Sequence, residues 1–145
     1  MKTFDNPDKA EEIANKLYKD GIIVIAHATA NSGLGILLAA KKVSEETGIK
    51  RYMIGVDSDL YNLVSDELRP YVLTSSLKNI GDSIFEFTVN YLNFSLPTSN
   101  NLFFGLKENG VGFSTSGNHN STATIEKMIE AKNKIISGDI VVNST

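Results

Sequence analysis

The stretch at residues 22–35, IIVIAHATANSGLG, gives the most direct indication of the fold class of this 145-residue chain. Residues 22–26 are a continuous apolar run, which is typical of a strand buried on both faces of a parallel sheet. A loop of small and polar residues follows, and the apolar spacing from Ile36 to Val43 predicts a helix that ends at Gly48. A buried strand that leads through a short loop into a helix is the repeating unit of α/β folds.

The same alternation continues on both sides of this stretch. Upstream, Asn6 is a good N-cap and Pro7 suits the first position of an amphipathic helix that Gly21 ends. Downstream, the pattern predicts helices at about 79–92 and from 125 to Gly138, and strands at 51–56, 71–75, 102–106, 110–113 and 139–142. This order predicts a three-layer, doubly wound α/β fold with a mainly parallel sheet, in a single lobe that spans residues 1–145.

Composition and charge narrow the possible functions. A net charge of −3 provides no electrostatic footprint for nucleic acid, and no apolar window is long enough to insert into a membrane. The chain has no Cys, and His27 and His119 lack the spacing of metal ligands, so we expect no metal site. His27 is interpreted as a cap on its strand. No nucleophile elbow or phosphate-binding loop is present, so we expect no catalytic residue and no cofactor.

Candidate ligand-binding residues lie where the predicted strands end, because ligands of doubly wound sheets bind beyond the carboxyl ends of the strands. Gly33 begins a helix there, and the helix N-terminus offers free N–H donors to an oxygen-rich group. The alternative is an ordinary tight connection. Asp57 ends another strand and can accept two hydroxyl groups of a sugar, whereas Asp59 is better read as a helix cap.

Two further segments leave alternatives open. The hydroxyls and ammonium of residues 74–78 either bind a polar ligand or form a helix cap beside a surface Lys78. Gly33-Leu34-Gly35 followed by Asp57 also suggests a dinucleotide fingerprint, and hence an enzyme. That hypothesis fits poorly, because Leu38 stands where the third glycine belongs.

Several segments, in this order, resemble the basic membrane protein family, the purine nucleoside receptors among the substrate-binding lipoproteins of ABC transporters. They cover nearly the whole chain: FDNPDKA (4–10), SGLG (32–35), IGVDSD (54–59), LTSSLKN (73–79), FGLKENGVG (104–112) and IISGDIVV (135–142). The resemblance implies part of a type I periplasmic-binding-protein fold. It also implies a solute-binding protein and not an enzyme.

The resemblance further implies roles for four residues. Phe4 stacks on the nucleobase, Asp57 takes the ribose hydroxyls, Lys78 reaches the sugar, and Gly33 lies against the ligand. The implied partners are a nucleoside and, for a full-length protein, the permease of an ABC transporter. Members of the family are extracytoplasmic and membrane-anchored, although the opening residues of this chain show no signal segment and no lipid-bearing Cys.

The chain also departs from the family pattern. Ala30-Asn31 replaces paired glycines, and Asn109 replaces another glycine. The family's front part, with most of its first lobe, has no counterpart here. The chain therefore either binds a nucleoside for uptake or is a structural or regulatory remnant without tight binding. Without the preceding strand, residues 22–25 become an exposed edge, and the apolar helix at 79–92 lacks a cover, so we expect a homo-oligomer.

Overall fold

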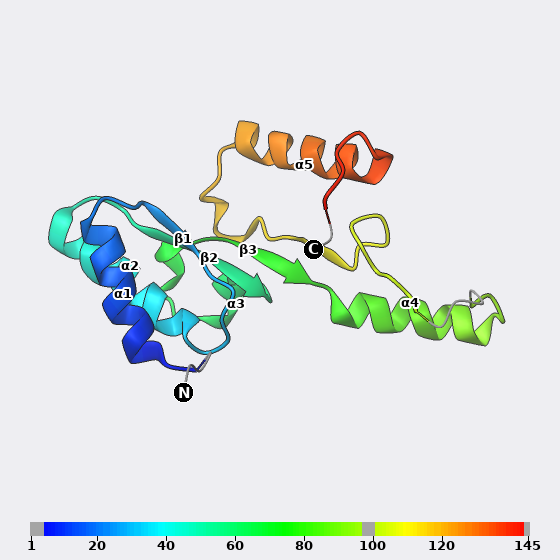
Figure 1. Cartoon of the computed structure of the whole chain (residues 1–145), viewed down its shortest axis with the longest axis horizontal. Helices are drawn as coiled ribbons and strands as arrows, with labels where there is room; N and C mark the ends of the chain where they lie inside the picture. Colours follow the sequence, from blue (N-terminus) through cyan, green and yellow to red (C-terminus); the bar gives the residue numbers. More distant parts are fainter. Residues whose placement is uncertain (1–4, 97–100, 144–145) are drawn as a thin grey trace. The chain divides into compact units, whose positions relative to one another are not determined.

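A computed structural model describes residues 5–96 and 101–143 of the chain. Helices and strands alternate along it, as the sequence predicts (Figure 1). The α-helices and β-strands among the described residues are α1 (Pro7–Lys19), β1 (Val24–Ala26), α2 (Gly33–Thr47), β2 (Tyr52–Asp57), α3 (Leu60–Leu63), β3 (Val72–Lys78), α4 (Ile80–Leu92), β4 (Val111–Phe113) and α5 (Thr122–Ser137). None of the described helices is long and apolar enough to cross a bilayer.

The four strands form one sheet in the order β1-β2-β3-β4. β1 runs parallel to β2, with Val24 opposite Tyr52. The N–H of Ser114 donates to the carbonyl of Ser75, and the N–H of Asn79 donates to the carbonyl of Gly110. Residue numbers therefore rise on β3 as they fall on β4, so this pair is antiparallel. The predicted α/β fold with a mainly parallel sheet is confirmed.

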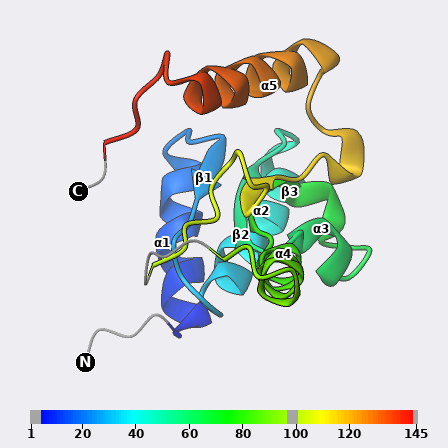
Figure 2. The ribbon, with the colours of Figure 1, turned by 90° about the vertical axis from the view of Figure 1, so that its right-hand side faces the viewer.

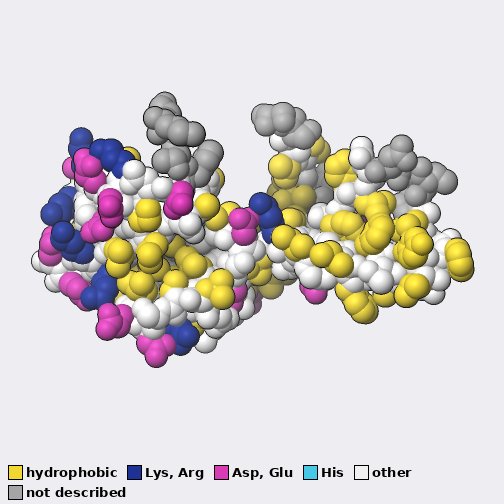
Figure 3. Space-filling model, turned by 90° about the horizontal axis from the view of Figure 1, so that it is seen from below, with side chains coloured by type: hydrophobic (Ala, Val, Ile, Leu, Met, Phe, Trp, Pro, Cys, Tyr) yellow, Lys and Arg dark blue, Asp and Glu magenta, His cyan; other side chains and the backbone are white. Residues whose placement is uncertain are grey.

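The chain divides into two compact units. The first comprises Met1–Ser76 and Phe113–His119, and the second comprises Leu77–Gly112 and Asn120–Thr145. The hydrophobic core lies entirely in the first unit, where α1 and α2 lie side by side (Figure 2) and pack with β2 and β3. No described hydrophobic side chain of the second unit is fully buried, and hydrophobic side chains gather at the surface of α4 (Figure 3).

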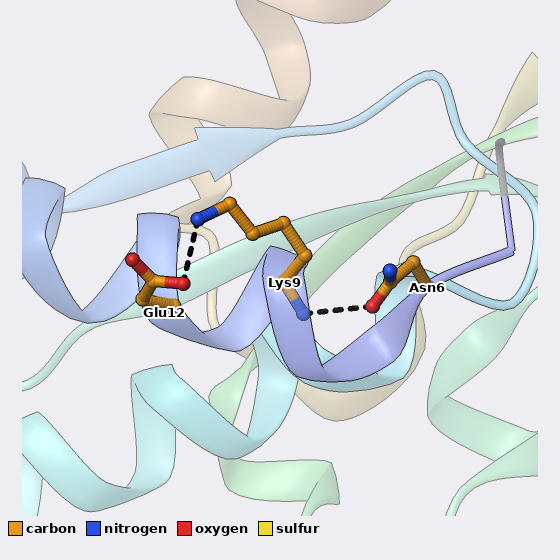
Figure 4. Close-up of polar contacts among 3 residues, drawn as sticks. All are labelled: Asn6, Lys9 and Glu12. Atoms are coloured by element: carbon orange, nitrogen blue, oxygen red, sulfur yellow. Dashed lines mark hydrogen bonds and ion pairs between the residues drawn. The ribbon is translucent and has the colours of Figure 1, made fainter. Parts of the chain in front are cut away.

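Local sequence signals explain where the two core helices begin and end. The Asn6 side chain accepts a hydrogen bond from the N–H of Lys9 at 3.0 Å, and the Lys9 ammonium pairs with Glu12 at 2.6 Å (Figure 4). Asn6 is therefore the N-cap of α1, as predicted. α2 ends at Gly48, whose φ of 69° lies in the left-handed region that glycine tolerates best. Both predicted helix boundaries are confirmed.

Close packing of α1 on α2 depends on Gly35. A Cβ at this position would lie 2.0 Å from the carbonyl oxygen of Pro7, so only glycine allows the two helices to approach this closely. The Oγ of Ser32 accepts a hydrogen bond from the N–H of Asn6 at 2.9 Å, which fixes the start of α1 against the start of α2. The second glycine of the suspected dinucleotide fingerprint thus has a packing role.

Two predicted strands are absent, and a third is shorter and less buried than predicted. β1 starts only at Val24 and is not buried on both faces, because it lies at the end of the sheet; Ile22 and Ile23 are 44% and 45% exposed. Residues 102–106 form no strand, since the chain folds into a local turn in which Gly110 donates to the carbonyl of Gly105. Residues 139–142 form none either, because Ile140 turns back to bond the carbonyl of Lys134.

Candidate functional site

A cavity of about 430 Å³ lies in the first unit, at the carboxyl ends of β1 and β2. This volume falls in the range of small-molecule sites. Gly33 and Asp57, predicted from separate segments, both line it. The other lining residues come from the start of α1, the loop after β1, α2, the end of β2 and α3: Pro7, His27, Thr29, Ala30, Asn31, Leu34, Leu37, Val56, Ser58, Leu60, Leu63 and Val64.

Asp57 has an unusual backbone. Its φ of 69° lies in the left-handed region, where Asp is tolerated better than most residues other than glycine. The N–H of Ser58 donates to the carbonyl of Val56 at 2.9 Å and closes a tight turn around it. Backbone strain of this kind costs about 1–3 kcal/mol and is concentrated at functional sites. The conformation therefore adds a second reason, besides its position, to regard Asp57 as a binding residue.

The lining combines a small polar set with an apolar wall. Asp57 and His27 are the two titratable groups among the described residues that line the cavity, joined by the uncharged polar side chains of Thr29, Asn31 and Ser58. The remaining side chains are mostly aliphatic, from α2 and α3. Such a surface suits a ligand with one apolar face and with hydroxyl groups that donate to a carboxylate.

Gly33 accommodates the ring of His27. A Cβ on Gly33 would lie 2.6 Å from Cε1 and 2.9 Å from Nε2 of that ring, so the imidazole occupies the space that any other side chain would need. The sequence interpretation of His27 as a strand cap missed its place in the cavity. The available signal was its position directly after a strand, in the same loop as Gly33.

The predicted free N–H donors at the start of α2 are not free. The N–H groups of Gly33, Leu34 and Gly35 donate to the carbonyls of Ala30, Asn31 and Ser32 at 3.1–3.2 Å. Three successive turns lead into the helix and use these donors. The expectation that they face an oxygen-rich ligand is therefore wrong, and the polar side chains remain as the groups available for recognition.

The segment at 74–78 is divided between structural and undetermined roles. The Thr74 hydroxyl donates to the carbonyl of Ser114 at 2.6 Å, and the buried Ser75 hydroxyl accepts from the N–H of Leu60 at 3.1 Å. Both hydroxyls therefore hold the first unit together. Lys78 belongs to the second unit, where it lines a different cavity of about 490 Å³ with apolar residues of α4. Phe4 lies outside the described residues.

Asp59 stands at the predicted cap position before α3, but its side chain bonds elsewhere. Its carboxylate accepts from the side-chain amide of Asn62 at 2.7 Å and from the Ser116 hydroxyl, and it makes no bond to the helix N–H groups. Asp59 thus fixes the segment around Ser116 to the first unit. No group of three or more His, Asp or Glu in residues 5–96 and 101–143 is arranged to hold a metal ion.

Comparisons with known proteins agree with this architecture. The family model for PnrA-like ABC transporter substrate-binding proteins matches residues 1–145. Basic membrane protein A2 of Borrelia garinii is 32% identical over 141 residues, covering 97% of this chain and 40% of that protein. A T-cell-stimulating antigen of Listeria monocytogenes is 28% identical, covering 96% of this chain and 41% of that protein. The chain thus spans about 40% of the length of these relatives.

The fold is also similar to a solved structure. An ABC transporter solute-binding protein from Conexibacter woesei superposes with a TM-score of 0.72 at 13% identity, covering 95% of this chain and 43% of that protein. At this identity the likeness concerns the fold alone. It places the four-stranded sheet and its helices within a periplasmic-binding-protein fold.

Proposed function

The chain belongs to the family of PnrA-like ABC transporter substrate-binding proteins, and on this basis we propose that it binds a purine nucleoside in the cavity of its first unit. The observation that carries the proposal is that Asp57 and Gly33, from two different βα connections, line one cavity of suitable volume. A ligand site at the carboxyl ends of neighbouring strands is the arrangement expected of a doubly wound sheet.

Each part of a nucleoside has a complementary group in this proposal. The Asp57 carboxylate accepts hydrogen bonds from the two ribose hydroxyls, which are stronger than bonds between neutral groups. The aliphatic side chains of Leu34 and Leu63 provide an apolar surface for the base. Two further contacts are proposed from the family resemblance alone, a stack of Phe4 on the base and a contact of Lys78 with the sugar, because Phe4 lies outside the described residues and Lys78 lines the cavity of the second unit. Stacking of a base on an aromatic side chain contributes about 1–3 kcal/mol.

We further propose that ligand binding serves uptake. The partner is the permease of an ABC transporter. The protein is extracytoplasmic and membrane-anchored, as in the family, and the chain forms a homo-oligomer. The binding step needs no cofactor and no covalent chemistry, because recognition by hydrogen bonds and stacking is reversible.

A remnant without tight binding is the alternative. The observation that favours it is that Ala30 and Asn31 line the cavity at the positions where the family has paired glycines. Their side chains take up space that glycines would leave open to the ligand. In this reading the first unit keeps its fold and its partners while the ligand is lost.

Calorimetry with inosine, guanosine, adenosine and NAD tests the proposal and separates it from its rivals. We expect one nucleoside to bind at a single site per chain, and 2′,3′-dideoxynucleosides to bind more weakly. Phe4→Ala and Lys78→Ala in the same panel test their proposed contacts, each lowering the affinity. No heat with any nucleoside would favour the remnant, whereas binding of NAD alone would favour a nucleotide cofactor and contradict the proposal.

A further inference from the structure

The imidazole of His27 is enclosed on two sides at the carboxyl end of β1. One side is Gly33, whose missing Cβ leaves the room that the ring fills. The other side is Thr29, two residues later in the loop that lines the cavity. The position of this ring and the shape of the cavity are therefore coupled, because the same loop contributes Thr29, Ala30 and Asn31 to the lining.

The hydrogen bonds of the ring determine its tautomer. The backbone N–H of Thr29 donates to Nδ1 of His27 at 3.3 Å, and the Thr29 hydroxyl lies 3.1 Å from the same nitrogen. A backbone N–H can only donate, so Nδ1 is the acceptor and the hydrogen of the neutral ring is on Nε2. Nε2 is buried and has no hydrogen-bond partner among the described residues.

We propose that His27 is a proton-sensitive positioning residue of the cavity: its neutral imidazole holds the loop at Thr29 in the shape that lines the cavity, and protonation releases that loop. One proton from solvent adds to Nδ1, and the hydrogen bond from the N–H of Thr29 breaks because both groups are then donors. The Thr29 hydroxyl can still accept from the new Nδ1–H, so the change affects the backbone amide of Thr29 most.

The charges around the ring set the balance between its two forms. α1, α2 and α3 contribute no charged side chain to the cavity lining, so Asp57 is the charged group that faces His27 there among the described residues. Burial lowers the pKa of His27, and the nearby Asp57 carboxylate raises it by a smaller amount. The neutral ring is thus the form that the folded chain favours near neutral pH.

A ligand in the cavity would strengthen this preference, and this step rests on the proposed nucleoside binding. Filling the cavity excludes water from the ring, which lowers the pKa of His27 further. Because the ligand-bound form then holds its proton less tightly than the free form, binding releases a proton. The affinity is therefore constant where His27 is neutral and decreases as the pH falls through the pKa of His27 in the free chain.

Nuclear magnetic resonance of the ligand-free chain tests the positioning role without any nucleoside. We expect ¹⁵N shifts of a ring protonated at Nε2, a pKa below the ordinary histidine value, and an amide resonance of Thr29 that titrates together with His27. His119, which packs on Tyr52 and Tyr61 away from the cavity lining, is the internal control. A ring protonated at Nδ1, or a Thr29 amide that ignores the titration of His27, would overturn the proposal.

Three substitutions separate the contact with Gly33 from the proposed nucleoside binding. Gly33→Ala should lower the melting temperature of the parent chain but not of a His27→Ala chain, in which the clash is removed. An equal loss in both backgrounds would contradict the packing of the ring on Gly33. His27→Phe keeps a ring without titration, so nucleoside affinity should become independent of pH between about 7.5 and 5. A parent affinity that does not fall over this range, or a His27→Phe chain that keeps the fall, would overturn the inference while leaving nucleoside binding intact.

Discussion

Asp57 has two properties that substitutions can separate, a charged carboxylate and a backbone in the left-handed region. Asp57→Asn keeps a residue that tolerates the left-handed region but removes the charge. A hydrogen bond to a charged group contributes about 1.5–3 kcal/mol, so we expect nucleoside affinity to fall at least about tenfold with little change in stability. Calorimetry measures the first and urea unfolding the second.

Asp57→Gly is the matched control for the backbone. Glycine adopts a φ of 69° without steric cost, so this variant should fold at least as well as the parent and still lose the nucleoside. If Asp57→Asn and Asp57→Gly both bound the nucleoside as the parent does, the carboxylate would have no role in recognition.

Tyr18 tests the core of the first unit at a single hydroxyl group. The side chain is fully buried, and its hydroxyl donates to the carbonyl of Tyr52 at 2.8 Å. Burial raises the pKa of this hydroxyl, which therefore remains a donor well above neutral pH. Tyr18→Phe leaves the carbonyl without this donor, and we expect a loss of about 1–3 kcal/mol in the free energy of unfolding. An unchanged urea midpoint would show that water replaces the hydroxyl.

At the scale of the elements, the approach of α1 to α2 is the contact most sensitive to one methyl group. A Cβ on Gly35 would overlap the carbonyl of Pro7, so Gly35→Ala must move one helix. Overpacking of this kind costs about 1–3 kcal/mol. Gly81→Ala is the matched control, because a Cβ there meets nothing within 4 Å and helix propensity favours Ala by up to about 1 kcal/mol. Equal melting temperatures for the two variants would contradict this account of the packing.

The helices were predictable because their signals are local. The cap at Asn6 and the left-handed Gly48 act within one turn of the helix that they bound, so the sequence alone reveals them. The strands at 102–106 and 139–142 were wrongly predicted because an apolar run does not reveal whether a neighbouring strand exists. Ile22 and Ile23 show the same ambiguity, since their burial depends on a partner on the open side of β1.

Part of the candidate site was also predictable from the sequence. Gly33 and Asp57 could be paired in advance because parallel strands bring their carboxyl ends to one edge. The role of His27 could not, because it depends on the close contact between its ring and Gly33. The hydrogen bonds of the N–H groups at the start of α2 could not be predicted either, because they depend on turns that the residue types do not specify.

At the scale of the whole molecule, the second unit has no buried hydrophobic core of its own among the described residues. We propose that both units nevertheless fold as the single lobe expected from the sequence. The prediction is one cooperative urea transition, with coincident midpoints from far-ultraviolet circular dichroism and from tyrosine fluorescence, which is usable because the chain has no Trp. Two separated transitions would show that the units unfold independently.

The exposed apolar surfaces lead to a prediction about assembly. β1 lies at the end of the sheet, and Phe85 of α4 is 72% exposed. An unprotected edge strand and an uncovered apolar helix both favour association, so light scattering at micromolar concentration should give the mass of a dimer or a higher oligomer. Ile23→Lys places a charge beside the edge and should shift the mass toward the monomer. A stable monomer of the parent chain would contradict the prediction.

The central claim is that the cavity at the carboxyl ends of β1 and β2 is the nucleoside site. Mapping amide shifts of the ¹⁵N-labelled chain during titration with inosine, guanosine or adenosine tests it most directly. The account predicts saturable shifts centred on the amides at 27–37 and 56–64, which enclose the cavity, and a titration of the same amides in Asp57→Asn that needs at least about ten times more nucleoside. Shifts centred instead on Ile84 and Phe87, which line the cavity of the second unit, or no shifts with any of the three nucleosides, would contradict it.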